Sequence, residues 1–149
     1  MREAGRWAWR LLVTQALCIL AVWLGSWVPG LETVLAGVYL LALWQAGREM
    51  AADLPGPPGM WAAASLSQLP GWMLTVPNLL AYLGGWSLAG DYPFLLEVWH
   101  TPWLPLVAWM AFPAWGGYAA YFLALLPLSA LTMLVVAAGY AWGRRGASS

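Results

Sequence analysis

Charged residues are scarce in this sequence, and lysine is missing from it altogether. Charged side chains make up 8% of the 149 residues, whereas about 25% is usual for a soluble globular domain. Hydrophobic residues make up 62%, and the mean hydropathy is +0.69. So little polar surface cannot cover a soluble domain, and we expect most of the exterior to face lipid. The lack of lysine beside abundant arginine, alanine, glycine and tryptophan indicates a GC-rich, bacterial genome.

The motifs of the common enzyme classes are also missing. One cysteine, Cys18, excludes an internal disulfide and any paired-cysteine motif. The serines of "AASLSQ" lie outside a G-x-S-x-G context, and the chain has no Walker A motif and no basic run. Zinc sites need three or four convergent ligands, whereas "EVWH" offers one glutamate and the single histidine. We therefore expect no metal, no cofactor and no nucleic-acid partner, and we favour a protein that is not an enzyme.

What the chain does have is a series of long apolar runs. The first follows a short basic stretch, as in a signal peptide, but no A-x-A-like cleavage site follows it. We therefore predict a retained transmembrane helix ended by Pro29-Gly30, and a loop over 48–59, where prolines and glycines oppose a continued helix. The fold class predicted is all-α, a polytopic integral membrane helix bundle. We expect residues 1–149 to form one membrane domain, with four spans at 9–28, 31–47, 62–90 and 116–143. The third is too long to cross upright, so either it tilts and kinks at Pro70 and Pro77, or residues 60–69 lie in the interface.

All six arginines fall on one side of this four-span bundle. The positive-inside rule makes that side cytoplasmic, which places both termini in the cytoplasm of a multi-pass cell-membrane protein. A fifth span through 97–115 would move the last two arginines to the opposite side, so four spans are preferred. The arginines are Arg2, Arg6 and Arg10 before the first span, Arg48 after the second, and Arg144 and Arg145 after the last.

Residues 92–115 join the third and fourth spans and are rich in proline and tryptophan. Prolines break any long helix there, and unpaired backbone cannot face lipid. We predict an outer interfacial segment with one or two short helices capping the bundle, with re-entry into the bilayer as the alternative. Asp91, Glu97 and His100 form a candidate polar cluster on the outer face. Glu97 and His100 share one side of a helix at their spacing of three, and we expect both to point toward the headgroups.

Two polar stripes run along the third and fourth spans. Because polar groups in lipid face the bundle and hydrogen-bond across helices, we expect the stripes to face one another. The first stripe covers an arc of about 140° and the second about 100°, at the helical turn of about 100° per residue. The stripes are Ser65, Gln68, Thr75, Asn78 and Tyr82 on the third span, and Tyr118, Tyr121, Ser129, Thr132 and Tyr140 on the fourth.

The stripes support two functional hypotheses. As a means of joining helices, they fit a non-enzymatic subunit or an accessory or assembly factor of a membrane complex, with a membrane-protein partner or a second copy. The alternative is a small permease or ligand-binding bundle with a polar cavity between spans three and four. In that case Gln68, Asn78, Tyr121 and Thr132 are the candidate ligand-binding residues. Paired amides in a closed interface favour the first hypothesis, and unpaired amides facing a cavity favour the second.

Overall fold

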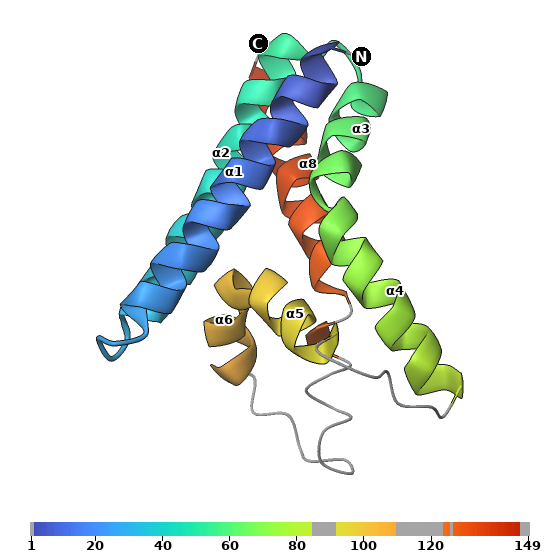
Figure 1. The fold of residues 1–149 in the computed structure, drawn as a ribbon. Helices are drawn as coiled ribbons and strands as arrows, with labels where there is room; N and C mark the ends of the chain where they lie inside the picture. Colours follow the sequence, from blue (N-terminus) through green and yellow to red (C-terminus); the bar gives the residue numbers. More distant parts are fainter. Residues whose placement is uncertain (1, 85–91, 110–123, 126, 147–149) are drawn as a thin grey trace.

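The computed structural model describes residues 2–84, 92–109, 124–125 and 127–146. Every regular element in these residues is helical (Figure 1), which confirms the prediction of an all-α chain. The elements are α1 (Arg2–Gly25), α2 (Leu31–Asp53), α3 (Pro57–Ser67), α4 (Leu69–Gly84), α5 (Tyr92–Trp99), the 3-10 turn η1 (Thr101–Trp103), α6 (Leu104–Trp109) and α8 (Leu128–Gly146).

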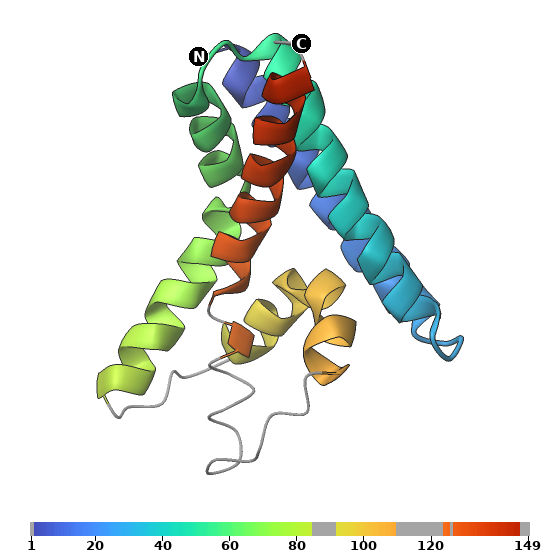
Figure 2. The same ribbon diagram turned by 180° about the vertical axis from the view of Figure 1, so that it is seen from behind.

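The helices form two legs that meet at one end and diverge toward the other (Figures 1 and 2). Antiparallel α1 and α2 make one leg, and α3 continued by α4 makes the second. We call the meeting end the apex; it is built from the start of α1, the end of α2, α3 and the end of α8. Both ends of the chain lie there (Figure 1). The basic residues of α8, Arg144 and Arg145, are in its last turn at the same end.

Helix α1 starts seven residues earlier than the predicted span over 9–28 and ends three residues earlier. Its first turns are helical because Ala4, Trp7 and Ala8 are buried at the apex, where α1 packs against α3. At its far end, Gly30 adopts a positive φ of 82°, which lets the chain turn tightly into α2. Within the described ranges, α1 is the one helix long and apolar enough to cross a membrane; signal sequences and buried helices of soluble proteins meet that criterion too.

Helix α2 continues beyond the predicted end at residue 47 and runs to Asp53. The loop prediction over 48–59 was therefore wrong for most of its length, and the actual connection is 54–56. Packing explains the extension, because Met50 and Ala51 are buried at the apex. Pro57 opens α3, a position where its missing N–H leaves no hydrogen bond unmade.

The predicted third span over 62–90 is divided into two helices, α3 and α4. The helix breaks at Gln68, whose φ of −96° and ψ of 4° leave the helical region, and not at either proline. Pro70 lies in the first turn of α4, where a helix tolerates proline. Pro77 lies inside α4, and the helix continues through it. Residues 85–90 lie outside the described residues.

Helix α8 covers the C-terminal part of the predicted fourth span and extends three residues past its expected end at 143. Residues 116–123 of that span lie outside the described residues. Glycines let α8 contact α2 backbone to backbone. A Cβ added at Gly47 would lie 2.1 Å from the carbonyl oxygen of Val136, and one at Gly139 would lie 2.0 Å from that of Trp44. Only glycine therefore fits at these two contacts.

The segment Tyr92–Trp109, which contains α5, η1 and α6, fills the opening between the two legs (Figures 1 and 2). We call this segment the wedge. Its prolines prevent one long helix, as predicted, because Pro102 and Pro105 each start a new short helical piece. The prediction of a cap across the end of the bundle was wrong, because the wedge inserts between the legs. Residues 110–115 lie outside the described residues.

Candidate functional site

A buried polar cluster surrounds the tip of the wedge, the turn from Trp99 to Trp103. It unites side chains from both legs, the wedge and α8, and each is no more than 3% exposed. Two indoles of the wedge, those of Trp99 and Trp103, donate hydrogen bonds to it. The polar cluster consists of Gln15, Tyr39, Gln68, His100, Ser129 and Thr132.

Gln15 joins the wedge to the first leg. Its Nε2 donates a hydrogen bond to the carbonyl oxygen of Trp99 at 2.7 Å, and its Oε1 accepts one from the hydroxyl of Tyr39. The Trp99 carbonyl ends α5, so it has no partner within its own helix, and Gln15 supplies one. The ring of Trp103 stands edge-on to Tyr39, at 6.2 Å between centroids and 85° between planes. These contacts fix the tip of the wedge against α1 and α2.

His100 joins the wedge to α8. Its Nδ1 lies 2.9 Å from the carbonyl oxygen of Leu96, and its Nε2 lies 3.2 Å from Oγ of Ser129. Because a carbonyl can only accept, we assign the proton to Nδ1, and the Ser129 hydroxyl then donates to Nε2. His100 is therefore a neutral ring that connects two elements.

The expectation that His100 points toward the headgroups was wrong, because the side chain is 1% exposed. The turn between α5 and η1 directs the ring inward, where Ser129 offers a partner. Glu97 is half-buried, and its backbone carbonyl accepts a hydrogen bond from Oγ1 of Thr101 at 3.3 Å. Asp91 lies outside the described residues. In the part of the chain that the structure describes, no three His, Cys, Asp or Glu side chains come together as a metal site.

Two of the four predicted ligand-binding residues join the polar cluster. Oε1 of Gln68 accepts a hydrogen bond from Trp99 Nε1 at 3.4 Å. Oγ1 of Thr132 accepts one from Trp103 Nε1 at 3.0 Å and donates to the Leu128 carbonyl at 2.9 Å.

The third, Asn78, donates from Nδ2 to the carbonyl of Leu74 in its own helix at 2.7 Å. Tyr121 lies outside the described residues.

Among the described residues, the two predicted stripes face one another where α3 passes into α4. A Cβ added at Gly71 would lie 2.3 Å from Oγ of Ser129, so α4 and α8 nearly touch there. Beyond this point the legs diverge, and α4 packs against α5 (Figure 1). The farther part of the stripe, Thr75 and Asn78, therefore does not face α8 directly. Oγ1 of Thr75 is buried without a hydrogen-bond partner among the described residues.

Gln15 and Tyr39 lie outside the two predicted stripes, although the sequence carries a signal for Gln15. Gln15 is the single amide in the middle of the first apolar run, and an amide in such a run must turn toward protein. Its partner at Trp99 is 84 residues away, and no local pattern indicates it. Tyr39, Trp99 and Trp103 carry their polar atoms on large apolar rings, so hydropathy patterns do not mark them.

The polar cluster is closed to solvent, and its hydrogen bonds join neighbouring parts of the chain. A serine hydrogen-bonded to an imidazole resembles an activated nucleophile, but a nucleophile needs access to its substrate. Ser129 is 0% exposed and His100 is 1% exposed, so a substrate cannot reach them. The far side of the imidazole is bonded to a backbone carbonyl and not to a carboxylate. This arrangement holds three parts of the chain together.

Comparisons of the chain with models of known protein families, with curated proteins and with solved structures each gave no match. The polar cluster and the outer surface of the two legs therefore carry the functional inference.

Proposed function

We propose that this protein is a multi-pass membrane protein that acts as a non-enzymatic subunit or accessory factor of a membrane complex. The observation that carries the proposal is the reversal of polarity between inside and outside. Large apolar side chains cover the outer faces of both legs, an arrangement too costly for a protein in water. The most exposed include Trp9, Leu17, Trp23, Val34 and Leu41 on the first leg, and Met73 and Leu83 on the second, all between 60% and 80% exposed.

Polar side chains take the opposite position and are bonded to one another inside. In hydrocarbon, such groups face the bundle because lipid offers them no partner. The polar cluster at the wedge tip fits this rule. The arginine positions agree with it, because α1 starts, α2 ends and α8 ends at the apex (Figure 1). By the positive-inside rule the apex lies on the cytoplasmic side, together with both termini.

The wedge favours re-entry into the bilayer over an interfacial position. Its tip contacts Gln15, which lies near the middle of α1. The wedge opens toward the end of the molecule opposite the arginines, so it would enter from the outer side (Figure 1). Its non-helical turn at His100 is enclosed by protein. Irregular backbone is tolerated at membrane depth only under that condition.

The closed polar cluster supports the role in packing over the rival permease. A permease needs a polar path between helices, with groups free to bind a solute. Where the polar cavity was predicted, Gln68 and Thr132 instead accept hydrogen bonds from the indoles of Trp99 and Trp103. The surface left for recognition is the apolar outside of the legs, where helices of another membrane protein can pack.

A two-stage experiment tests this function. Membrane fractionation, with reporter fusions after residue 90 and at Ser149, should place the chain in the membrane with residue 90 outside and the C-terminus inside. Photo-crosslinking residues are then placed singly at the outward positions Leu17, Leu41 and Met73. We expect one leg to give a discrete protein adduct in native membranes. Only lipid adducts at every position, together with a monomeric mass after gentle extraction, would contradict the role as a subunit.

A further inference from the structure

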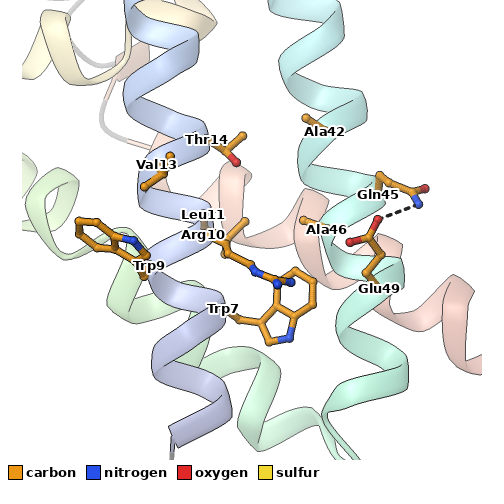
Figure 3. A pocket seen from close by; sticks show the side chains of 10 residues that line it. All are labelled: Trp7, Trp9, Arg10, Leu11, Val13, Thr14, Ala42, Gln45, Ala46 and Glu49. Atoms are coloured by element: carbon orange, nitrogen blue, oxygen red, sulfur yellow. Dashed lines mark hydrogen bonds between the residues drawn. The ribbon is translucent and has the colours of Figure 1, made fainter.

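A groove of about 510 Å³ lies between α1 and α2, toward the apex (Figure 3). It has two different ends. Toward the apex its walls carry Arg10 on α1 and Glu49 on α2, and toward the middle of the leg they carry Val13 and Ala42. The apolar end continues into the exposed apolar surface at Leu17 and Leu41 on the same two helices. The groove is thus amphipathic along its length.

Arg10 is held in place at the charged end. Its guanidinium lies over the ring of Trp7, at 4.8 Å from the ring centroid. Trp7 is 3% exposed, and its indole N–H donates to Oδ2 of Asp53 at 3.0 Å, so the ring is fixed. Arg6 makes ion pairs with Glu3 and Asp53, whereas Arg10 makes none with the described residues. Arg10 therefore presents a positioned positive charge that no carboxylate neutralises.

Glu49 presents the opposite charge from the facing wall. Its Oε1 accepts a hydrogen bond from Nε2 of Gln45 at 3.1 Å, one helical turn away on α2 (Figure 3). The neighbouring cation, Arg48, lies over Trp44 at 5.0 Å instead of pairing with Glu49. Arg10 and Glu49 line the same groove without forming an ion pair. The space between them suits a ligand that carries both charges.

We propose that this groove binds the headgroup of a zwitterionic phospholipid that carries a primary ammonium group. Arg10 contacts the phosphate, Glu49 accepts hydrogen bonds from the ammonium, and an acyl chain leaves past Val13 and Ala42. A quaternary ammonium has no N–H to donate to Glu49. An anionic headgroup without an amine would leave Glu49 unpaired beside a second negative charge. The inference rests on the proposed membrane placement, which puts the apex at the inner headgroup layer.

Native mass spectrometry of the purified, delipidated protein tests the site. Phosphatidylethanolamine, phosphatidylcholine and phosphatidylglycerol with identical acyl chains are added in turn, and the fraction of lipid-bound protein is measured. We expect phosphatidylethanolamine to bind about fivefold more tightly than either of the others, the ratio that one partly exposed charge contact supplies. Equal binding of the three lipids, or a preference for either of the other two, overturns the proposal.

Two variants separate the roles of the charges. Arg10→Gln should weaken all three lipids, because all carry the phosphate, whereas Glu49→Gln should remove only the preference for phosphatidylethanolamine. Arg2→Gln and Glu3→Gln are matched controls, since neither residue lines the groove. A preference that survives Glu49→Gln, or that the controls also remove, overturns the assignment. Fractionation is done first: recovery in the soluble fraction refutes both the function and the site, whereas membrane recovery without lipid preference refutes the site alone.

Discussion

The two ends of the molecule hold their helices together in different ways. At the apex, α2 and α8 touch backbone to backbone at Gly47 and Gly139, with no room for a side chain. At the splayed end the legs are apart, and the wedge between them is hydrogen-bonded to each. It bonds to Gln15 of the first leg and to Gln68 of the second, and also to α8 through His100 and Trp103. Close backbone approach depends on shape alone, whereas the bridge depends on polar pairing. The same substitution type should therefore act differently at the two ends.

The largest effect is expected from adding one methyl group at the apex. Gly47→Ala places a Cβ 2.1 Å from the Val136 oxygen, which forces α2 and α8 apart. We expect a loss of about 3 kcal/mol in the free energy of unfolding, the upper range for overpacking. Denaturant unfolding in mixed micelles measures it. Gly37→Ala on the same helix is the matched control, because nothing lies within 4 Å of its added Cβ. Equal stability of the two variants would refute the glycine contact.

A smaller loss is expected when the bridge to the first leg is removed. Gln15→Leu keeps the volume but leaves the Trp99 carbonyl without its partner and removes the amide oxygen that accepts from the Tyr39 hydroxyl. The loss of these two buried hydrogen bonds should cost about 2 kcal/mol, because the protein interior offers little compensation. Gln45→Leu, at an exposed position of α2, is the control and should leave stability almost unchanged. Proteolysis should also cut the wedge faster in the Gln15 variant.

A still smaller effect is expected from the hydrogen bond between Trp103 of the wedge and Thr132 of α8. Trp103→Phe and Thr132→Val each remove the hydrogen bond at 3.0 Å while leaving most of the packing in place. A double-mutant cycle should give a coupling of about 1 kcal/mol, typical of one buried hydrogen bond. The cycle pairing Trp103→Phe with Gly37→Ala should give no coupling. Full additivity of the first pair would mean that the indole and the hydroxyl do not interact.

The smallest effect is expected at the exposed polar edge of the apex. Asp53→Asn removes the ion pair to Arg6, whose atoms lie 3.3 Å apart. This ion pair is weak because both side chains are exposed to solvent. Stability should fall by about 0.5 kcal/mol at low salt, and the difference should disappear in about 1 M salt through screening. Unfolding at two salt concentrations measures it. A salt-independent loss would instead point to the hydrogen bond from Trp7 to the same oxygen.

Local patterns in the sequence predict helices well here and contacts poorly. Prolines at 102 and 105 predict the short pieces of the wedge, and Pro29-Gly30 predicts the turn between α1 and α2. A kink was predicted at Pro70, whereas the helix breaks at Gln68, because proline is tolerated in the first turn of the new helix. The spacing of Gly139 and Gly143 is a recognised small-residue pattern for close helix contact, and it could have indicated the α8 surface that meets α2.

The polar cluster was predictable only in part. Gln68 and Thr132 follow from the rule that polar groups in apolar helices turn inward. The inward position of His100 could not be predicted in this way, because a turn that the wedge adopts against α8 sets the direction of its side chain. The link from Gln15 to Trp99 joins residues that no helical period relates, so only the tertiary structure reveals it.

The wedge also sets a time order for assembly during synthesis. Its partners lie on both sides of it in the chain: Gln15 and Tyr39 leave the ribosome before it, and Ser129 and Thr132 leave after it. Until α8 emerges, the His100 ring lacks its donor, the Ser129 hydroxyl, and the Trp103 indole lacks its acceptor, Oγ1 of Thr132. The tip can therefore settle only after the last helix arrives. A chain stopped before residue 129 would therefore lack both of these partners, and the tip of its wedge would be held by Gln15 and Gln68 alone.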